Sequence, residues 1–421
     1  MVNGIRNKIS TLSKNKDAKT VAGNFMWLSA LQVAGYVFPL ITMPYLARVI
    51  GVEGFGKIAF ATAIMIWIQT IADWGFNLTA TRDVAQNRDN PKRVSEIFSN
   101  VLWARCLLMI LSFVILLVLI AVIPKFREEQ VVILVTFLMI PGHILFPDWF
   151  FQAIEKMKYI TLLNVLMKLI FTIAIFIFVK DPDDYILQPL FTSIGYVICG
   201  VIALFLIIGK WGIKLQKPSW NLVVKTIKDS TDVFINNLMP NLYNSFSTML
   251  LGFIGGGSAV GILDGGNKFI YAGTQLQTTI NRAFYPFLSR KVEQHSTYVK
   301  ICLCISSLLC ITFFLGAPLI VRILLSPEFA GAVSVIRIRS ISMIFLTIFS
   351  AYGANYLIIK HEESLLRKIT MWCSIVGFVI SWPLIHYFSY IGAALTVTIS
   401  MALLAMFTFI AAIKIKNESN E

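Results

Sequence analysis

The stretch LLMILSFVILLVLIAVI, residues 107–123, carries no charged side chain and only one polar one, a serine. Residues 301–325 form a second long run that is almost as apolar. Only a helix satisfies all of its own backbone groups while crossing lipid in so few residues. The pattern repeats along nearly the whole chain, in which 57% of the residues are hydrophobic and 14% charged. The sequence therefore predicts an all-α membrane protein with almost no soluble domain.

Charged hinges divide the apolar runs into about twelve expected transmembrane helices. We place them at residues 22–47, 57–80, 97–123, 131–153, 160–179, 187–208, 233–254, 258–287, 300–325, 333–358, 369–388 and 391–413. The longest polar stretch between them, 209–232, carries five lysines and splits the spans into six and six. We expect a tail at 1–21, a six-helix lobe at 22–208, a connector at 209–232, a second six-helix lobe at 233–413 and a tail at 414–421.

The distribution of basic residues predicts the orientation of these spans. The two tails and the alternate loops on their side hold 24 Lys and Arg, whereas the opposite loops hold five. Because basic residues accumulate on the cytoplasmic side, both termini are expected to be cytoplasmic. This placement beside membrane ends also explains most of the net charge of +14, so we expect membrane lipids and no nucleic acid as partners.

Two glycine-rich hairpins indicate an internal repeat. IGVEGFG at residues 50–56 follows the first span of one half, and IGGGSAVG at 254–261 follows the first span of the other. Six helices per unit would make such repeats parallel, and in transporters of this construction the substrate site lies between the halves. Glycine-rich hairpins also arise from turn geometry alone, so the similarity has two interpretations, an internal duplication and a shared turn requirement.

Charged residues at membrane depth are costly and are candidates for function. Asp264 and Lys268 are spaced i, i+4, so they form either a structural ion pair or a cavity-lining pair that substrate or a coupling ion can open. Lys168 and Arg105 have no acidic residue in their own spans, so each needs a partner on another span or an anionic substrate. The carboxylates Asp73, Asp148 and Asp264 could carry a proton or sodium ion, or could form salt bridges to neighbouring cations.

Basic residues in the spans outnumber the three acidic residues, seven to three. A cation-rich interior suits a substrate with phosphate or other anionic groups. Amides and aromatic rings in the spans suit hydroxyl-rich ligands such as sugars. The candidate substrate-binding residues are Arg105, Lys168, Lys268, Arg282, Asn237, Asn241, Trp74 and Trp149.

The sequence contains no catalytic or metal-binding constellation. The four histidines are isolated in sequence, Cys302 and Cys304 lack ligand companions, and no expected outer loop exceeds about ten residues. We therefore expect neither an enzyme nor a metal site, and no cofactor beyond a proton or sodium gradient.

Three segments resemble the motifs of bacterial polysaccharide flippases. They are MPYLARVIGVEGFG at 43–56, DWGFNLTATRD at 73–83 and PDWFFQAIEKMKY at 147–159, with a weaker match in NRAFYP at 281–286. These flippases are the Wzx-type O-antigen transporters of the multidrug/oligosaccharidyl-lipid/polysaccharide exporter superfamily. The resemblance implies twelve helices in two lobes around a cationic central cavity. Its motifs do not themselves identify substrate-binding residues.

The resemblance also implies a function. The substrate would be an undecaprenyl-pyrophosphate-linked oligosaccharide, such as an O-antigen repeat unit, moved from the cytoplasmic to the periplasmic leaflet of the bacterial inner membrane. A polysaccharide polymerase and a chain-length regulator are expected partners. The alternatives are a drug/cation antiporter of the same superfamily, which predicts a net acidic cavity, and a polymerase or ligase, which predicts a long outer loop. A non-transporting scaffold would not need charges at membrane depth.

Overall fold

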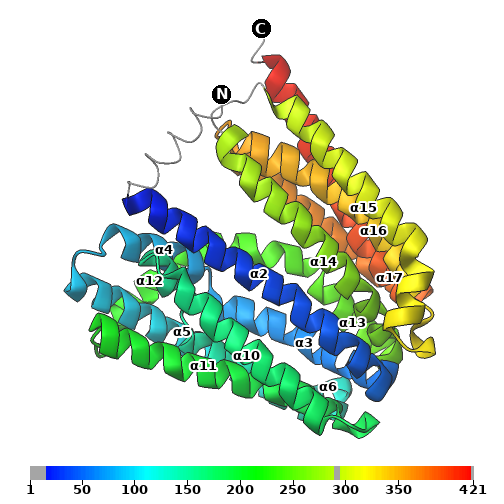
Figure 1. Cartoon of the computed structure of the whole chain (residues 1–421), viewed down its shortest axis with the longest axis horizontal. Helices are drawn as coiled ribbons and strands as arrows, with labels where there is room; N and C mark the ends of the chain where they lie inside the picture. The colour runs from blue at the N-terminus through cyan, green and yellow to red at the C-terminus, as the bar shows by residue number, and fades with distance from the viewer. Residues whose placement is uncertain (1–15, 289–293, 419–421) are drawn as a thin grey trace. The chain divides into compact units, whose positions relative to one another are not determined.

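The chain folds into helices joined by short turns (Figure 1). The computed structural model describes residues 16–288 and 294–418, and this part of the chain contains no β-strand. The expectation of an all-α protein is confirmed.

The elements fall into two groups by chain position. The first contains α2 (Lys16–Val49), α3 (Gly51–Asp73), α4 (Phe76–Gln86), α5 (Pro91–Val122), α6 (Pro124–Glu128), α7 (Gln130–Phe137), α8 (Met139–Leu145), α9 (Asp148–Ala153), α10 (Met157–Phe178), η1 (Pro182–Ile186) and α11 (Leu187–Trp211). The second contains α12 (Trp220–Leu238), η2 (Met239–Leu242), α13 (Ser245–Ile254), α14 (Gly256–Leu288), α15 (His295–Leu324), η4 (Pro327–Phe329), α16 (Ala332–Phe349), η5 (Ser350–Leu357) and α17 (Glu363–Glu418).

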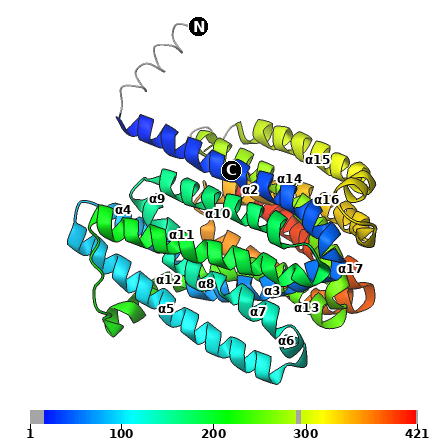
Figure 2. The same ribbon diagram turned by 60° about the horizontal axis from the view of Figure 1, so that its bottom comes forward.

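Packing divides the described residues into two compact units. Unit 1 comprises 16–42, 68–179 and 186–234, and unit 2 comprises 43–67, 180–185 and 235–418. Within unit 1, α11 packs along α8 and α10; within unit 2, α16 packs along α15 and α17 (Figures 1 and 2). The first glycine-rich hairpin thus belongs with the helices of the second half of the chain. The lobe boundaries derived from the sequence remain a prediction.

Several expected spans are interrupted helices. The fourth is built from α7, α8 and α9, with Pro147 at the break before α9. The seventh is split by the 3-10 turn η2, which contains Pro240. Because proline has no N–H and clashes with the preceding turn, it ends or bends helices at such points. The expected connector is also partly helical, since α11 continues to Trp211 and α12 begins at Trp220.

The long element α17 consists of two helices that fold back on each other. Ser389 has non-helical backbone angles (φ 50°, ψ −130°), which place a sharp bend there. A Cβ added to Gly377 would lie 2.3 Å from Ser400 Oγ, and one added to Gly392 would lie 1.9 Å from the Leu384 carbonyl oxygen. These contacts across the bend show that α17 supplies the two separate segments expected at 369–388 and 391–413.

The outer surfaces of the helices are apolar. Val122 on α5, Phe205 on α11 and Leu315 on α15 are each at least 70% exposed. Nine helical runs within the described residues are long and apolar enough to cross a membrane, and α17 is one of them. Large exposed apolar surfaces of this kind require lipid as the solvent. The chain is therefore a multi-pass membrane protein, while the count of twelve spans stays a prediction.

The two glycine-rich hairpins lie against each other within unit 2. A Cβ on Gly56 would lie 1.8 Å from the Gly257 carbonyl oxygen, and one on Gly261 would lie 2.0 Å from the Val52 carbonyl oxygen. The absence of side chains allows the backbones of α3 and α14 to approach this closely. The similar composition of the two hairpins therefore has a structural reason.

Neighbouring polar groups fix the same region. Glu328 accepts a hydrogen bond from the backbone N–H of Val52 at 3.0 Å, at the start of α3. Arg48 donates to the carbonyl of Ile323 at 2.7 Å, at the end of α15. A carboxylate at a helix N-terminus and a guanidinium at a C-terminus both satisfy backbone groups that the helix leaves unpaired. The 43–56 motif thus serves to anchor this hairpin.

Replacing Gly56 by alanine is expected to destabilise the protein by about 1–3 kcal/mol, because the new methyl group overlaps a backbone carbonyl that has little room to move. The matched control is Gly209→Ala on α11, where a Cβ meets nothing within 4 Å. Alanine there should stabilise the helix slightly. Thermal unfolding of both variants in detergent should give shifts of opposite sign, and equal shifts would contradict the close approach.

Candidate functional site

A buried polar cluster lies inside unit 1, where α3, α5 and α8 meet. The Arg105 side chain is 1% exposed and forms an ion pair with Asp73, whose side chain is 15% exposed. The sequence left the partner of Arg105 open between another span and the substrate. The structure supplies a carboxylate from α3.

His143 joins this cluster although it is isolated in the sequence. Its Nε2 lies 3.4 Å from the second carboxylate oxygen of Asp73 and 2.9 Å from Nε2 of Gln69. Asp148, at the N-terminus of α9, is near enough to interact electrostatically with Arg105, His143 and Asp73. We call Asp73, Arg105, His143 and Asp148 the unit 1 charge cluster.

When both carboxylates are ionised and His143 is neutral, the unit 1 charge cluster carries one more negative than positive charge, because it contains two carboxylates and one guanidinium. The guanidinium is also incompletely satisfied: Nε and Nη1 of Arg105 have no hydrogen-bond partner among the described residues. Buried polar groups without partners are uncommon, and each calls for an explanation. The cluster can therefore be neutralised by one more positive charge, and Arg105 retains N–H donors for a further hydrogen-bond acceptor.

Lys168 occupies the middle of α10 in unit 1. It is half-buried and makes no ion pair within the described part of the chain. A Cβ added to Gly35 on α2 would lie 3.6 Å from its ammonium nitrogen, so the ammonium lies against a bare stretch of helix. Lysine at this depth without a carboxylate is the arrangement that an anionic ligand would neutralise.

The two tryptophans expected to contact sugars differ in their surroundings. Trp149 is 1% exposed and packs in the core of unit 1 against Phe98 and Phe150. Trp74 is half-buried and stacks on Phe234, with ring centroids 3.8 Å apart. One face of Trp74 is therefore covered. The DWF stretch of the 147–159 motif contributes mainly to the core.

The two expected amides lie near the break in the seventh span. Asn237 is exposed on α12, and Asn241 is half-buried in η2. The structure thus leaves Asn237 accessible at the end of a helix, whereas Asn241 makes interactions of its own.

Lys268 and Asp264 form the pair expected from their spacing. The ammonium nitrogen of Lys268 lies 2.9 Å from the Asp264 carboxylate, and the side chains are 41% and 24% exposed. The same ammonium lies 3.9 Å from the ring centroid of Phe55, which belongs to the 43–56 motif. The pair is accessible, so a ligand can reach the ammonium without rearrangement of the core. The side chain of Arg282 lies outside the described residues.

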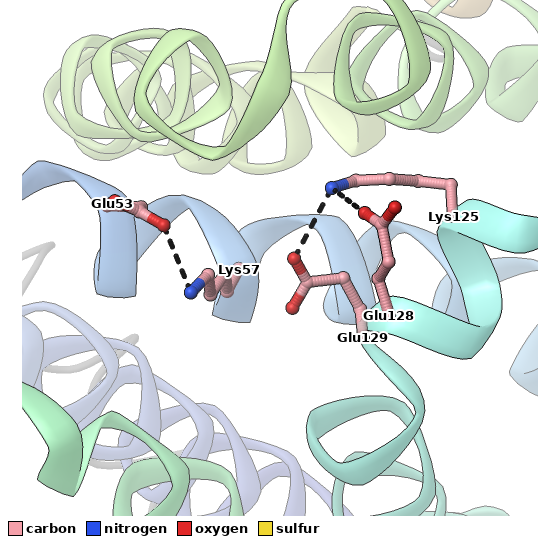
Figure 3. Close-up of polar contacts among 5 residues, drawn as sticks. All are labelled: Glu53, Lys57, Lys125, Glu128 and Glu129. Atoms are coloured by element: carbon pink, nitrogen blue, oxygen red, sulfur yellow. Dashed lines mark hydrogen bonds and ion pairs between the residues drawn. The ribbon is translucent and has the colours of Figure 1, made fainter.

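Two of the five basic residues expected in the outer loops, Lys57 and Lys125, have local acidic partners. Lys57 pairs with Glu53 at 3.0 Å on α3, and Lys125 contacts Glu128 at 2.9 Å and Glu129 at 3.5 Å (Figure 3). The hydrogen bond from Lys125 to Glu128 raises the pKa of that lysine. In the expected topology these pairs belong to the loops opposite the 24 basic residues, and neither pair carries net positive charge.

A cavity of about 140 Å³ lies inside unit 1 between α4, α5 and α12. Both acidic and basic side chains line it, among them Asp83, Arg93, Glu96, Lys225 and Asp229. None of the residues that the sequence singled out for substrate lines this cavity.

The chain belongs to the family described as polysaccharide biosynthesis protein, whose sequence profile matches residues 21–292, more than half of the chain. This confirms the resemblance carried by the three motifs. A "Putative O-antigen transporter" of Escherichia coli strain K12 is 28% identical over 390 residues, which cover 91% of this chain and 94% of that protein. A protein of the same name from Shigella dysenteriae is 27% identical over 396 residues, covering 91% and 98%.

The fold is shared with solved transporters. The lipid II flippase MurJ in an inward closed conformation matches with a TM-score of 0.74 and 14% identity, covering 92% of this chain and 87% of MurJ. A MATE in the straight conformation matches with a TM-score of 0.60 and 16% identity, covering 97% and 98%. At these identities the likeness concerns the fold alone.

Proposed function

We propose that this protein is a flippase for a lipid-linked glycan. In detail, it moves an undecaprenyl-pyrophosphate-linked oligosaccharide, such as an O-antigen repeat unit, from the cytoplasmic to the periplasmic leaflet of the bacterial inner membrane. Both termini are cytoplasmic in this proposal. The observation that carries it is Lys168, a lysine at membrane depth with no carboxylate in ion-pair range within the described residues. The names of the relatives from two bacteria point the same way.

The physical task of such a protein concerns the headgroup. Sugars and a pyrophosphate cannot cross hydrocarbon unaided, because each unpaired polar group costs several kcal/mol there. The polyprenyl tail can remain in the lipid. The protein therefore needs a polar, positively charged site that is exposed alternately to the two sides of the membrane.

The residues divide into two roles within this proposal. The residues proposed to supply positive charge for the pyrophosphate are Lys168 and Arg105 in unit 1 and, considered separately, Lys268 and Arg282 in unit 2. Ammonium and guanidinium groups suit phosphate oxygens because they form charge-assisted hydrogen bonds. Asn237 and Asn241 contact sugar hydroxyls, Trp74 stacks on a sugar ring with the face that Phe234 does not cover, and Trp149 supports this region from the core.

The unit 1 charge cluster is proposed to couple transport to an ion gradient. With both carboxylates ionised, the cluster carries two negative charges and one positive charge. Binding of a proton or a sodium ion then makes it neutral. The matching pair in unit 2, Asp264 with Lys268, is already neutral. Asp148→Asn should make the flipping rate insensitive to an imposed proton or sodium gradient, and an unchanged response would exclude this cluster from coupling.

The rival functions fit less well. A drug/cation antiporter shares the fold, as the MATE similarity illustrates, but the spans hold more cations than carboxylates. A polymerase or ligase acts on covalent bonds, whereas the curated relatives are named as transporters and MurJ as a flippase. We therefore assign the chain to transport rather than to catalysis. A polymerase and a chain-length regulator remain proposed partners, because an exposed repeat unit needs enzymes that extend it.

The proposal can be tested in a bacterium that assembles a lipid-linked glycan and lacks its chromosomal copy of the gene. Spheroplasts are treated with a membrane-impermeant oxidant, and the intact lipid-linked glycan is then quantified. Cells with the protein should expose the glycan to oxidation, and cells without it should protect the glycan. Equal protection in both would contradict the proposed function.

A further inference from the structure

A second buried arginine, in unit 2, is not used in the proposal above. Arg339 on α16 is 4% exposed, and its Nε donates to Oδ1 of Asn267 on α14 at 3.0 Å. The guanidinium also interacts with the hydroxyl of Tyr271, one turn further along α14. Its Nη1 has no hydrogen-bond partner among the described residues. An arginine near the end of a span could have reached the interface, but this one points into the protein.

Arg339 lacks the counter-ion that Arg105 has. Arg105 pairs with Asp73, whereas no carboxylate lies within ion-pair distance of Arg339 in the described part of the chain. Asp264, the acidic residue on the facing helix, pairs with Lys268. Arginine keeps its proton in proteins, so the charge cannot be removed by deprotonation. A buried charge without a partner costs several kcal/mol, and such a group is retained where a ligand completes it.

The neighbours of Arg339 leave an approach for such a ligand. Tyr271 is 49% exposed, and Lys268 is 41% exposed. Because residues three and four apart share a helix face, Tyr271 lies on the same face of α14 as Asn267 and Lys268. An anion that binds the Lys268 ammonium and the Tyr271 hydroxyl would therefore lie close to the Arg339 guanidinium, which interacts with the same hydroxyl. A phosphate has several acceptor oxygens, so it can accept hydrogen bonds from a guanidinium, an ammonium and a phenol at the same time.

We propose that Arg339, Tyr271 and Lys268 form an anion-binding site in unit 2 that takes the pyrophosphate of an isoprenoid lipid. The inference rests on the proposed function and names a residue set for it. Arg339 supplies the charge and the free Nη1 donor, and Asn267 holds the guanidinium in place. Lys268 can bind the substrate because its ammonium is 41% exposed, although it also pairs with Asp264.

The test is binding of farnesyl pyrophosphate, a short isoprenoid pyrophosphate, to the purified full chain in detergent. Arg339→Gln should weaken binding by about tenfold or more, since a charge-assisted hydrogen bond is lost. Arg339→Lys should bind more tightly than Arg339→Gln because it keeps the charge. The matched control is Arg337→Gln, two residues earlier on α16, where the arginine is exposed and lies over Phe314; its binding should stay within about twofold.

Stability distinguishes a ligand site from a structural role. Without ligand, Arg339→Gln should unfold at the same or a higher temperature than the parent protein, because an unpaired buried charge is removed. Asn267→Asp supplies the missing carboxylate at nearly constant shape, so it should raise the unfolding temperature and weaken binding. A lower unfolding temperature together with unchanged binding in Arg339→Gln would overturn the proposal.

Competition by two further ligands shows whether the site binds an isoprenoid pyrophosphate or any phospholipid headgroup. Inorganic pyrophosphate should compete with farnesyl pyrophosphate in the parent protein and compete more weakly in Arg339→Gln. Phosphatidylglycerol competing as well as farnesyl pyrophosphate would mean a general phospholipid site and would overturn the assignment. If the parent protein flips glycan while Arg339→Gln binds normally, only this inference fails. If the parent protein neither binds nor flips, the proposed function fails with it.

Discussion

Replacing Asp73 by asparagine is expected to lower the free energy of unfolding by about 3–5 kcal/mol, because among the described residues Asp73 is the carboxylate within ion-pair distance of the buried Arg105 guanidinium, and the more distant Asp148 replaces that contact only in part. The amide keeps the shape of the carboxylate, so the effect reports charge rather than packing. Thermal or denaturant-induced unfolding of the purified protein in detergent measures it.

The matched control for this prediction is Asp83→Asn in the following helix. Asp83 pairs with Arg82 at 2.9 Å, and its side chain is 42% exposed. Exposed pairs contribute at most about 1 kcal/mol. Adding Arg105→Gln to Asp73→Asn should recover part of the lost stability, because the stranded charge is then removed. Equal unfolding temperatures for Asp73→Asn and Asp83→Asn would show that the pair between Arg105 and Asp73 is not effectively buried.

Replacing Lys268 by alanine is expected to slow glycan translocation by about tenfold or more at normal expression, because a charge-assisted contact to the substrate phosphate is lost. Lys268→Arg should retain transport, since the positive charge stays. The initial rate of glycan exposure in reconstituted vesicles is the measurement. Lys57→Ala is the matched control, because Lys57 also belongs to an i, i+4 pair in unit 2.

A double variant separates the two roles that the spacing of Asp264 and Lys268 leaves open. If the pair is only structural, Asp264→Asn with Lys268→Gln removes both charges and should restore transport. If the ammonium binds substrate, the double variant should stay as slow as Lys268→Ala. Full activity in Lys268→Ala alone would remove this residue from the site.

The helical fold could be predicted from the sequence, because a segment that crosses lipid must satisfy its backbone hydrogen bonds internally. Long apolar runs must be helical, and the bend between the two expected last spans coincides with Ser389 in α17. The pair Asp264–Lys268 was also predictable, because both residues lie on one helix and only helical geometry is needed.

Contacts between distant helices were not predictable from the sequence. His143 lies 74 residues from Gln69 and has no local signal that links it to Asp73. Arg337 and Arg339 are two residues apart on α16, yet Arg337 is exposed and Arg339 is buried, because a two-residue step on a helix turns the side chain to the other side. Which face of a span is buried depends on the packing of whole helices, and a single sequence does not encode that directly.

Flipping is measured directly in proteoliposomes that contain an undecaprenyl-pyrophosphate-linked oligosaccharide and the purified protein. The fraction of glycan that an external impermeant oxidant can reach is followed over time, with and without protein. A flippase should expose the inner-leaflet glycan in a protein-dependent way, and the exposure should be slowed by about tenfold or more in both Lys168→Ala and Lys268→Ala. Exposure of half of the glycan regardless of protein, under every ion gradient and with the host's own repeat unit, would contradict it.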